Sequence, residues 1–149
     1  MAEVCIGAEK MIEAGTQNYR IDKSFATAEE TIAMSTIYAA NHMEGVKAMV
    51  TLTESGRTAL MTSRLNSLLP IFALSPNERT LNRCSLYRGV TPVFFDTKVE
   101  TGFDVALAAL NTLRKKKLLE FGDLVIITQG DIMDVEGSTN CMRILPVFE

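Results

Sequence analysis

Short apolar runs alternate with longer amphipathic stretches along most of this 149-residue chain. The runs are flanked by glycine, proline and other turn residues, which is typical of strands buried in a mostly parallel sheet. The amphipathic stretches repeat apolar residues with the period of an α-helix. The apolar runs predict strands at residues 46–52, 70–74, 91–95, 124–128 and 142–148.

Capping patterns mark two of the predicted helix starts. Thr27 and Glu30 form a capping box, in which each side chain satisfies a free backbone donor. Ser75 and Glu78 repeat this pattern, with Pro76 at the first helical position. With the apolar periodicity, these patterns predict helices at residues 1–11, 27–43, 59–65, 76–87 and 102–117. The expected apolar faces are Ile32, Ala33, Ile37, Ala40 and Met43 in one helix, and Phe103, Ala106, Leu107, Leu110 and Leu113 in another.

This alternation of helices and strands predicts a three-layer α/β/α fold with a mostly parallel sheet of five strands. No crossover helix precedes the last strand, so that strand is expected to pair antiparallel at an edge. Ligands of such sheets bind beyond the carboxyl ends of the strands. The loops at residues 53–58 and 129–138 both lie at that end, so they are expected to share one pocket.

Composition and charge argue against several classes of function. A net charge of −3 gives no reason to expect nucleic acid or an anionic membrane surface as a partner. No apolar run approaches the ~18 residues of a membrane span, and no signal-peptide pattern occurs. The cysteines match no metal-ligand spacing, so reduced thiols in a cytoplasmic protein are expected at Cys5, Cys84 and Cys141.

Residues 51–58 join a predicted strand to a predicted helix through a hydroxyl-rich loop that contains a glycine. Backbone N–H groups at a helix start, together with the helix dipole, favour an anion such as phosphate. The loop lacks the glycine–lysine ending of a nucleotide P-loop, so phosphoryl transfer is not expected here. From these residues alone, a phosphate site and an ordinary helix cap are equally good interpretations.

The other candidate groups do not form a reaction centre. Asp131, Asp134 and Glu136 lack the spacing of a calcium hand, which favours a solvated acidic turn. His42 is the single histidine, and with no second ligand or nucleophile partner it is expected to cap or pack. We therefore predict a binding site without catalytic residues and without a metal or cofactor of its own.

Five blocks of sequence resemble one known family when they are taken together. They lie at residues 53–58, 70–74, 86–92, 122–130 and 137–144. In this order they are similar to the C-terminal domain of pyruvate kinase, in particular the bacterial branch activated by AMP and sugar monophosphates. The resemblance implies an allosteric domain with an antiparallel last strand, whose edge pairs across a two-fold axis in a homotetramer.

The resemblance also implies a set of effector-binding residues. The expected phosphate contacts are Thr53, Ser55, Gly56, Arg57 and Thr58. The expected closing loop carries Gly130, Asp131, Gly137 and Ser138. Members that respond to fructose bisphosphate often carry a lysine where Glu54 stands here, and a basic residue in the closing loop. In this chain, the closing loop has no cation between residues 131 and 136. The expected effector is therefore a sugar monophosphate or AMP.

The resemblance divides the chain into two parts. Residues 1–22 are similar to the end of the last barrel helix and a linker, and residues 23–149 to the C-terminal domain. The catalytic barrel, with its magnesium and potassium sites, and the lid domain have no counterpart here, so this glycolytic phosphotransferase activity is not expected of the chain alone. An alternative is a free-standing phosphometabolite sensor or a small phosphatase-like enzyme, with Ser55 or Asp131 as the candidate reactive residue.

Overall fold

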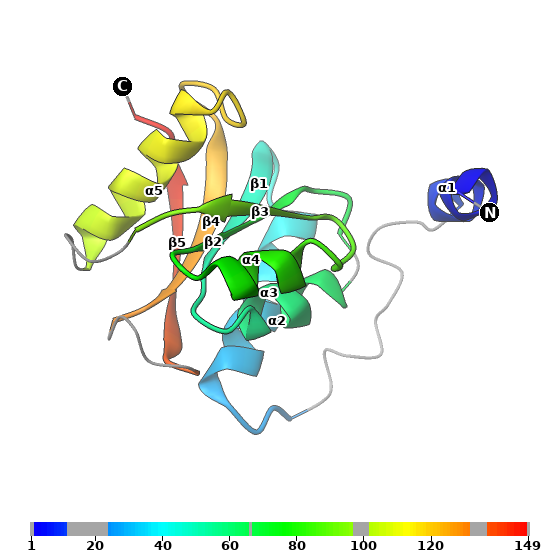
Figure 1. Ribbon diagram of the computed structural model, residues 1–149, viewed down its shortest axis with the longest axis horizontal. Helices are drawn as coiled ribbons and strands as arrows, with labels where there is room; N and C mark the ends of the chain where they lie inside the picture. Colours follow the sequence, from blue (N-terminus) through cyan, green and yellow to red (C-terminus); the bar gives the residue numbers. More distant parts are fainter. Residues whose placement is uncertain (1, 12–23, 66, 97–101, 132–136, 149) are drawn as a thin grey trace.

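The computed structural model describes residues 2–11, 24–65, 67–96, 102–131 and 137–148. Its centre is a five-stranded sheet in the order β3-β2-β1-β4-β5 (Figure 1). Only β5 runs antiparallel to its neighbour, β4. The predicted fold class and the antiparallel last strand are confirmed. The strands are β1 (Val46–Leu52), β2 (Ile71–Ser75), β3 (Val90–Phe94), β4 (Leu124–Gly130) and β5 (Thr139–Pro146).

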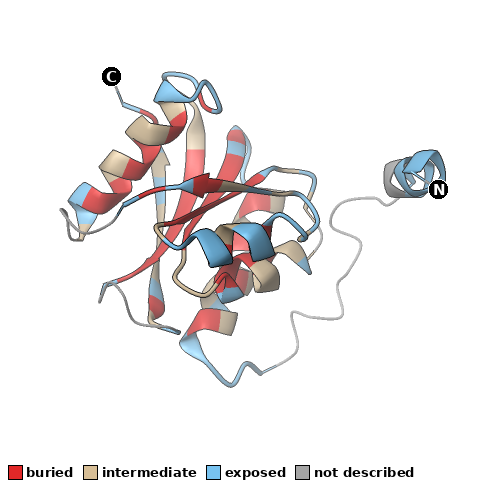
Figure 2. Cartoon of the chain, viewed as in Figure 1, coloured by how far each residue is buried: buried red, intermediate tan, exposed pale blue. Residues whose placement is uncertain are grey.

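The helices of the sheet domain cover both of its faces. Alternate strand residues point to opposite sides, so each face presents apolar side chains for helices to bury. Val50 packs with α5 in the larger core cluster, whereas Met49 packs with α2 in a second cluster. The inner strands β2, β1 and β4 are almost wholly buried between these layers, whereas most residues of the edge strands β3 and β5 are not (Figure 2). The helices are α1 (Ala2–Lys10), α2 (Ala28–His42), α3 (Arg57–Ser63), α4 (Glu78–Cys84) and α5 (Phe103–Lys115).

The cap of α2 is confirmed. The Glu30 N–H donates to Thr27 Oγ1 at 3.2 Å, and Glu30 Oε2 accepts from the Ala26 N–H at 3.2 Å. The buried face of this helix includes Ala33, Ile37 and Ala40, as expected, but Met43 is the C-terminal cap and is exposed. The face also contains a residue that the apolar pattern did not include, Glu29.

The predicted start of α4 is wrong. Ser75 is a fully buried strand residue paired with Phe94, and its hydroxyl accepts from the Asn77 N–H at 3.2 Å, ahead of the helix. The cap is Asn77, whose Oδ1 accepts from the Arg79 N–H at 3.0 Å. The helix also ends at Cys84, earlier than predicted.

Two further boundaries differ from the sequence prediction. Gln129 and Gly130 belong to β4 and not to the loop that follows it, because their pairing with β5 continues to the strand end. In α5, Phe103 lies in the first turn and is exposed, while Val105 and Ala109 join the buried face. Of the predicted barrel-helix end and linker at residues 1–22, residues 12–22 lie outside the described residues, and residues 2–8 of α1 are exposed.

Candidate effector site

The loop between β1 and α3 is held in shape by two hydrogen bonds of Thr53. Thr53 Oγ1 accepts from the Gly56 N–H at 3.0 Å, and the Thr53 N–H donates to Leu74 O at 3.0 Å. Gly56 is the N-cap of α3 with φ +79°, a backbone conformation that favours glycine. A Cβ at this position would lie 3.0 Å from Cys84 Sγ. The loop therefore needs glycine both for its backbone and for its contact with α4.

Helix α4 supports the same loop from the side. Thr80 Oγ1 donates to Glu54 O at 2.6 Å, and Arg83 Nη1 donates to Ser55 O at 3.2 Å. Burial raises the pKa of the Cys84 thiol, and the Arg83 charge opposes this rise. The sequence pattern does not single out Arg83, yet the structure places its cation directly beside the loop.

A buried polar cluster lies beneath the loop. Glu29 of α2 is only 4% exposed, and its Oε2 lies 3.2 Å from Arg57 Nε. The Thr58 hydroxyl donates to Glu29 Oε1 at 2.8 Å and lies 2.9 Å from Thr139 Oγ1. The hydroxyl of Thr58 thus points into the domain, and the residue as a whole is buried.

Position, rather than motif, is the signal that identifies Glu29. It precedes Ala33 and Ile37 by four and eight residues, so it falls on the stripe of α2 that is buried. A carboxylate on such a stripe requires a partner, because an unpaired buried charge is strongly unfavourable. The sequence does not tell which residue that partner is.

The topology of the sheet brings the first predicted loop next to the end of the second. Thr139 is the first residue of β5, directly after the second loop, and its hydroxyl meets Thr58 of the first. Asp131 is joined to Asn140 by two hydrogen bonds: the Asp131 N–H donates to Asn140 Oδ1 at 3.2 Å, and Asn140 Nδ2 donates to Asp131 Oδ2 at 3.1 Å. A side chain at Gly130 would collide with Ser138, and Gly137 has φ +73°. Asp134 and Glu136 lie outside the described residues.

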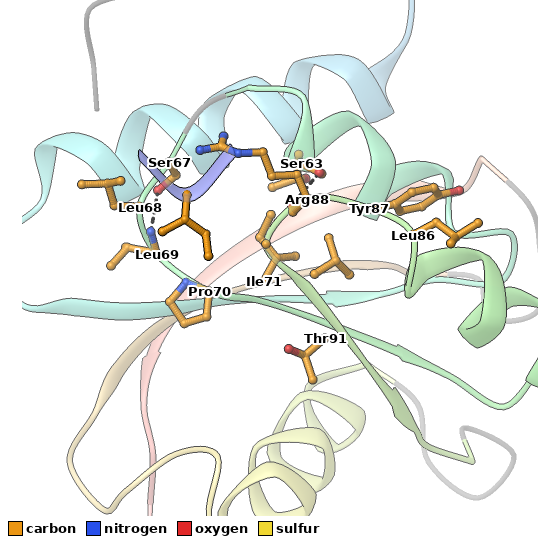
Figure 3. A pocket seen from close by; sticks show the side chains of 14 residues that line it. Ser63, Ser67, Leu68, Leu69, Pro70, Ile71, Leu86, Tyr87, Arg88 and Thr91 are labelled. Carbon is orange, nitrogen blue, oxygen red and sulfur yellow. Dashed lines mark hydrogen bonds between the residues drawn. The ribbon is translucent and has the colours of Figure 1, made fainter. Parts of the chain in front are cut away.

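The hollow drawn in Figure 3, of about 850 Å³, lies elsewhere. It is formed at the amino ends of β2 and β3, where Ser63 Oγ donates to Arg88 O at 2.7 Å. Leu68 and Leu86 at its rim are largely exposed. Because ligands of such sheets bind at the carboxyl ends of strands, this hollow is not the candidate effector site.

The described ranges also bear on metal binding and on membrane insertion. Within them, no group of three or more His, Cys, Asp or Glu side chains could hold a metal ion. No helix in the described part of the chain is long and apolar enough to cross a membrane. His42 stacks on Tyr38 with ring centroids 4.2 Å apart, and its Nδ1 lies 2.8 Å from Tyr38 O, as expected of a packing residue.

The fold and the loop together define a three-layer α/β domain with a candidate anion site. The family described as "Pyruvate kinase, alpha/beta domain" matches residues 30–145. This match covers most of the chain, which therefore belongs to the pyruvate kinase family as its C-terminal α/β domain. The alternative of a free-standing sensor or phosphatase-like enzyme is not favoured.

Individual relatives agree with the family assignment. Pyruvate kinase II of Salmonella typhimurium is 58% identical over 147 residues, which are 99% of this chain and 30% of that protein. A pyruvate kinase of Buchnera aphidicola is 55% identical over the same share of both chains. That of Thermotoga maritima is 39% identical over 101 residues, which are 68% of this chain and 21% of the relative. The chain spans about 30% of the length of the first two relatives.

Proposed function

We propose that this domain binds a phosphorylated effector and mediates oligomerisation in a pyruvate kinase, an enzyme that transfers phosphate from phosphoenolpyruvate to ADP. The proposal rests on the position of the loop at residues 53–58, which lies at the carboxyl edge of the sheet next to the start of β5. In the family that this chain resembles, this loop holds the effector phosphate. Its task is then to favour one quaternary state when the effector is bound.

The loop offers several groups to a phosphate. The first hydrogen bond within α3 runs from the Leu60 N–H to Gly56 O at 3.0 Å, so the N–H groups of Arg57 and Thr58 have no partner within the helix. Thr53 and Ser55 add hydroxyl groups, and Arg57 adds a half-exposed guanidinium. We assign Gly130, Asp131, Gly137 and Ser138 to the loop that closes over the rest of the effector.

Local charge favours a single phosphate group. The cations next to the loop are Arg57 and Arg83, and one of them already pairs with the carboxylate of Glu29. Glu54 and Asp131 add negative charge nearby. A second phosphate would require cations that these residues do not supply, because phosphate recognition depends on charge-assisted hydrogen bonds. The proposed effector is therefore a sugar monophosphate or AMP.

The test is isothermal titration calorimetry of the purified chain with ribose 5-phosphate, AMP, fructose 1,6-bisphosphate and unphosphorylated ribose. We expect binding of one of the monophosphates, weaker binding of the bisphosphate and none of ribose. A Thr53→Val, Ser55→Ala double variant should weaken the binding, since both hydroxyls are lost. Failure of both monophosphates to bind would contradict the proposed function.

The enzymatic reaction is assigned to the rest of a longer protein. In that protein, magnesium and potassium would act in the catalytic domain, and the effector and the β5 edge would act through this domain in a cytoplasmic homotetramer. Phosphate transfer from phosphoenolpyruvate to ADP by the 149-residue chain alone would contradict this division. A coupled assay of pyruvate formation measures it directly.

A further inference from the structure

Glu29 is a buried carboxylate on the face of α2 that packs into the domain. It lies in the first turn of α2 and is 4% exposed. The amino end of a helix stabilises a negative charge, but a buried carboxylate also needs direct partners. Its partners come from the candidate effector loop, at Arg57 and Thr58.

The hydrogen bonds of this cluster have a defined direction. Thr58 carries one hydroxyl proton, and that proton is donated to Glu29 Oε1 at 2.8 Å. Its oxygen therefore accepts from the Thr139 hydroxyl, 2.9 Å away. The resulting chain runs from Thr139 through Thr58 to Glu29, and successive hydrogen bonds of this kind strengthen one another. One carboxylate thus fixes the loop, α2 and the start of β5 relative to one another.

The contact with Arg57 fixes the direction of a cation. The carboxylate meets Nε, the inner nitrogen of the guanidinium, at 3.2 Å. The side chain of Arg57 remains 54% exposed, so the outer edge of its planar group stays accessible. A guanidinium binds phosphate through two parallel N–H groups, which makes its orientation as important as its charge.

We propose that Glu29 is a positioning residue of the effector site: it holds the Arg57 guanidinium and, through Thr58, the first turn of α3 in the arrangement that receives a phosphate. This inference rests on the proposed function. It opposes the simple electrostatic expectation, in which a carboxylate close to the site repels phosphate and its removal strengthens binding.

Glu29→Gln separates these two expectations in the complete chain. Glutamine keeps the size of the side chain and an oxygen for Thr58, but it removes the charged partner of Arg57. We expect the affinity for ribose 5-phosphate and for inorganic phosphate, measured by calorimetry, to fall about tenfold. The matched control is Glu30→Gln, on the same turn and with the same change of charge, which should leave both affinities within about twofold.

A second pair of variants tests orientation directly. Arg57→Lys keeps the charge and loses the planar group, so it should weaken phosphate binding to a similar extent. Adding Glu29→Gln to Arg57→Lys should then cost little more, since the orientation that Glu29 maintains is already lost. Arg57→Lys changes an exposed side chain and serves as the test even if Glu29→Gln fails to fold.

The possible results distinguish failure of the positioning role of Glu29 from failure of the proposed function. If the wild-type chain binds phosphate but Glu29→Gln binds equally well or more tightly, the positioning role is wrong. Unchanged binding by Arg57→Lys, or fully additive losses in the double variant, would also overturn it. If the wild-type chain binds none of the phosphorylated probes, the proposed function fails, and the positioning role fails with it.

Discussion

Gly56 shows how a single residue shapes the candidate site. Its φ of +79° is unfavourable for other residues, and an added Cβ would lie 3.0 Å from Cys84 Sγ. We expect Gly56→Ala to lower the free energy of unfolding by about 2 kcal/mol, measured by urea denaturation. Gly45→Ala is the matched control, because Gly45 has φ +86° with nothing within 4 Å.

The two glycine variants distinguish backbone strain from crowding. If strain alone decides, both variants lose the same stability. A larger loss of stability in Gly56→Ala than in Gly45→Ala is then due to the contact with Cys84. Gly56→Ala should also weaken binding of ribose 5-phosphate, because the loop must shift. Equal losses together with unchanged binding would mean that the close contact with α4 does not determine the loop.

The groups next to Gly56 predict a loss of stability in alkaline solution. Burial raises the pKa of Cys84 from its ordinary value of 9.0, and burial, with the charge of Cys84, raises that of Tyr87 from 10.0. The unfolded chain then releases these protons at lower pH than the folded chain. Their stabilising contribution is complete below about pH 9 and is lost as pH rises through the raised values.

Urea denaturation at about pH 8 and about pH 10 measures this effect. The free energy of unfolding should fall between the two values, and the fall should be smaller in Cys84→Ala, which removes one of the two groups. Cys5→Ala changes an exposed thiol and should show the wild-type fall. A wild-type stability that stays constant over this range would contradict the prediction.

Residue patterns that act over short distances were predictable, and those that act over long distances were not. The Thr27 cap joins residues three apart, so the sequence displays it directly. Glu29 meets Thr58 from 29 residues away, and Thr58 in turn meets Thr139 from 81 residues away, so no local pattern connects the three residues. Thr58 was predicted in the loop, but it lies in the first turn of α3 and its hydroxyl faces inward.

At the scale of elements, α4 illustrates competition between two local signals. Ser75, Pro76 and Glu78 form a good capping pattern, but Ser75 is required by the strand pairing of β2 with β3. Ser75 remains in β2 because the strand ends in a fully buried position, and Asn77 is the N-cap of α4. Periodicity similarly predicted α5 but misplaced Phe103, since the first turn of a helix can leave the layer that its later turns enter.

The position of this cap is testable. Asn77→Ala removes the acceptor of the Arg79 N–H and should lower the free energy of unfolding by about 1 kcal/mol in urea denaturation. Asn82→Ala is the control, because Asn82 is exposed inside the same helix, where alanine is at least as favourable. Equal stabilities of the two variants would show that Asn77 does not cap α4 in solution.

At the scale of the whole molecule, the order of elements carried most of the prediction. Alternating helices and strands determined the parallel sheet, and the missing crossover before β5 determined its antiparallel edge. The same topology placed Thr58 against the first residue of β5, directly after the second predicted loop. The hollow at the amino ends of β2 and β3 had no sequence signal, because its lining comes from helices, strands and turns that are separate in the sequence.

The exposed edge of β5 leads to a prediction about assembly. Within the described part of the sheet, β5 pairs with β4 alone, and it carries Ile144 at 37% exposure. An uncovered apolar edge strand tends to pair with another, and two identical edges can pair across a two-fold axis. We therefore expect the chain to form a dimer, and Ile144→Lys to convert it to a monomer by placing a charge in the interface.

Sedimentation equilibrium measures this change in mass, and circular dichroism verifies that the variant is folded. Leu86→Lys is the matched control: it makes the same kind of change at an apolar residue that is 84% exposed but lies at the hollow of Figure 3, away from β5. It should leave the dimer intact. A wild-type monomer would contradict pairing through β5 in the isolated chain, and a dimer disrupted by Leu86→Lys but not by Ile144→Lys would move the interface to the hollow.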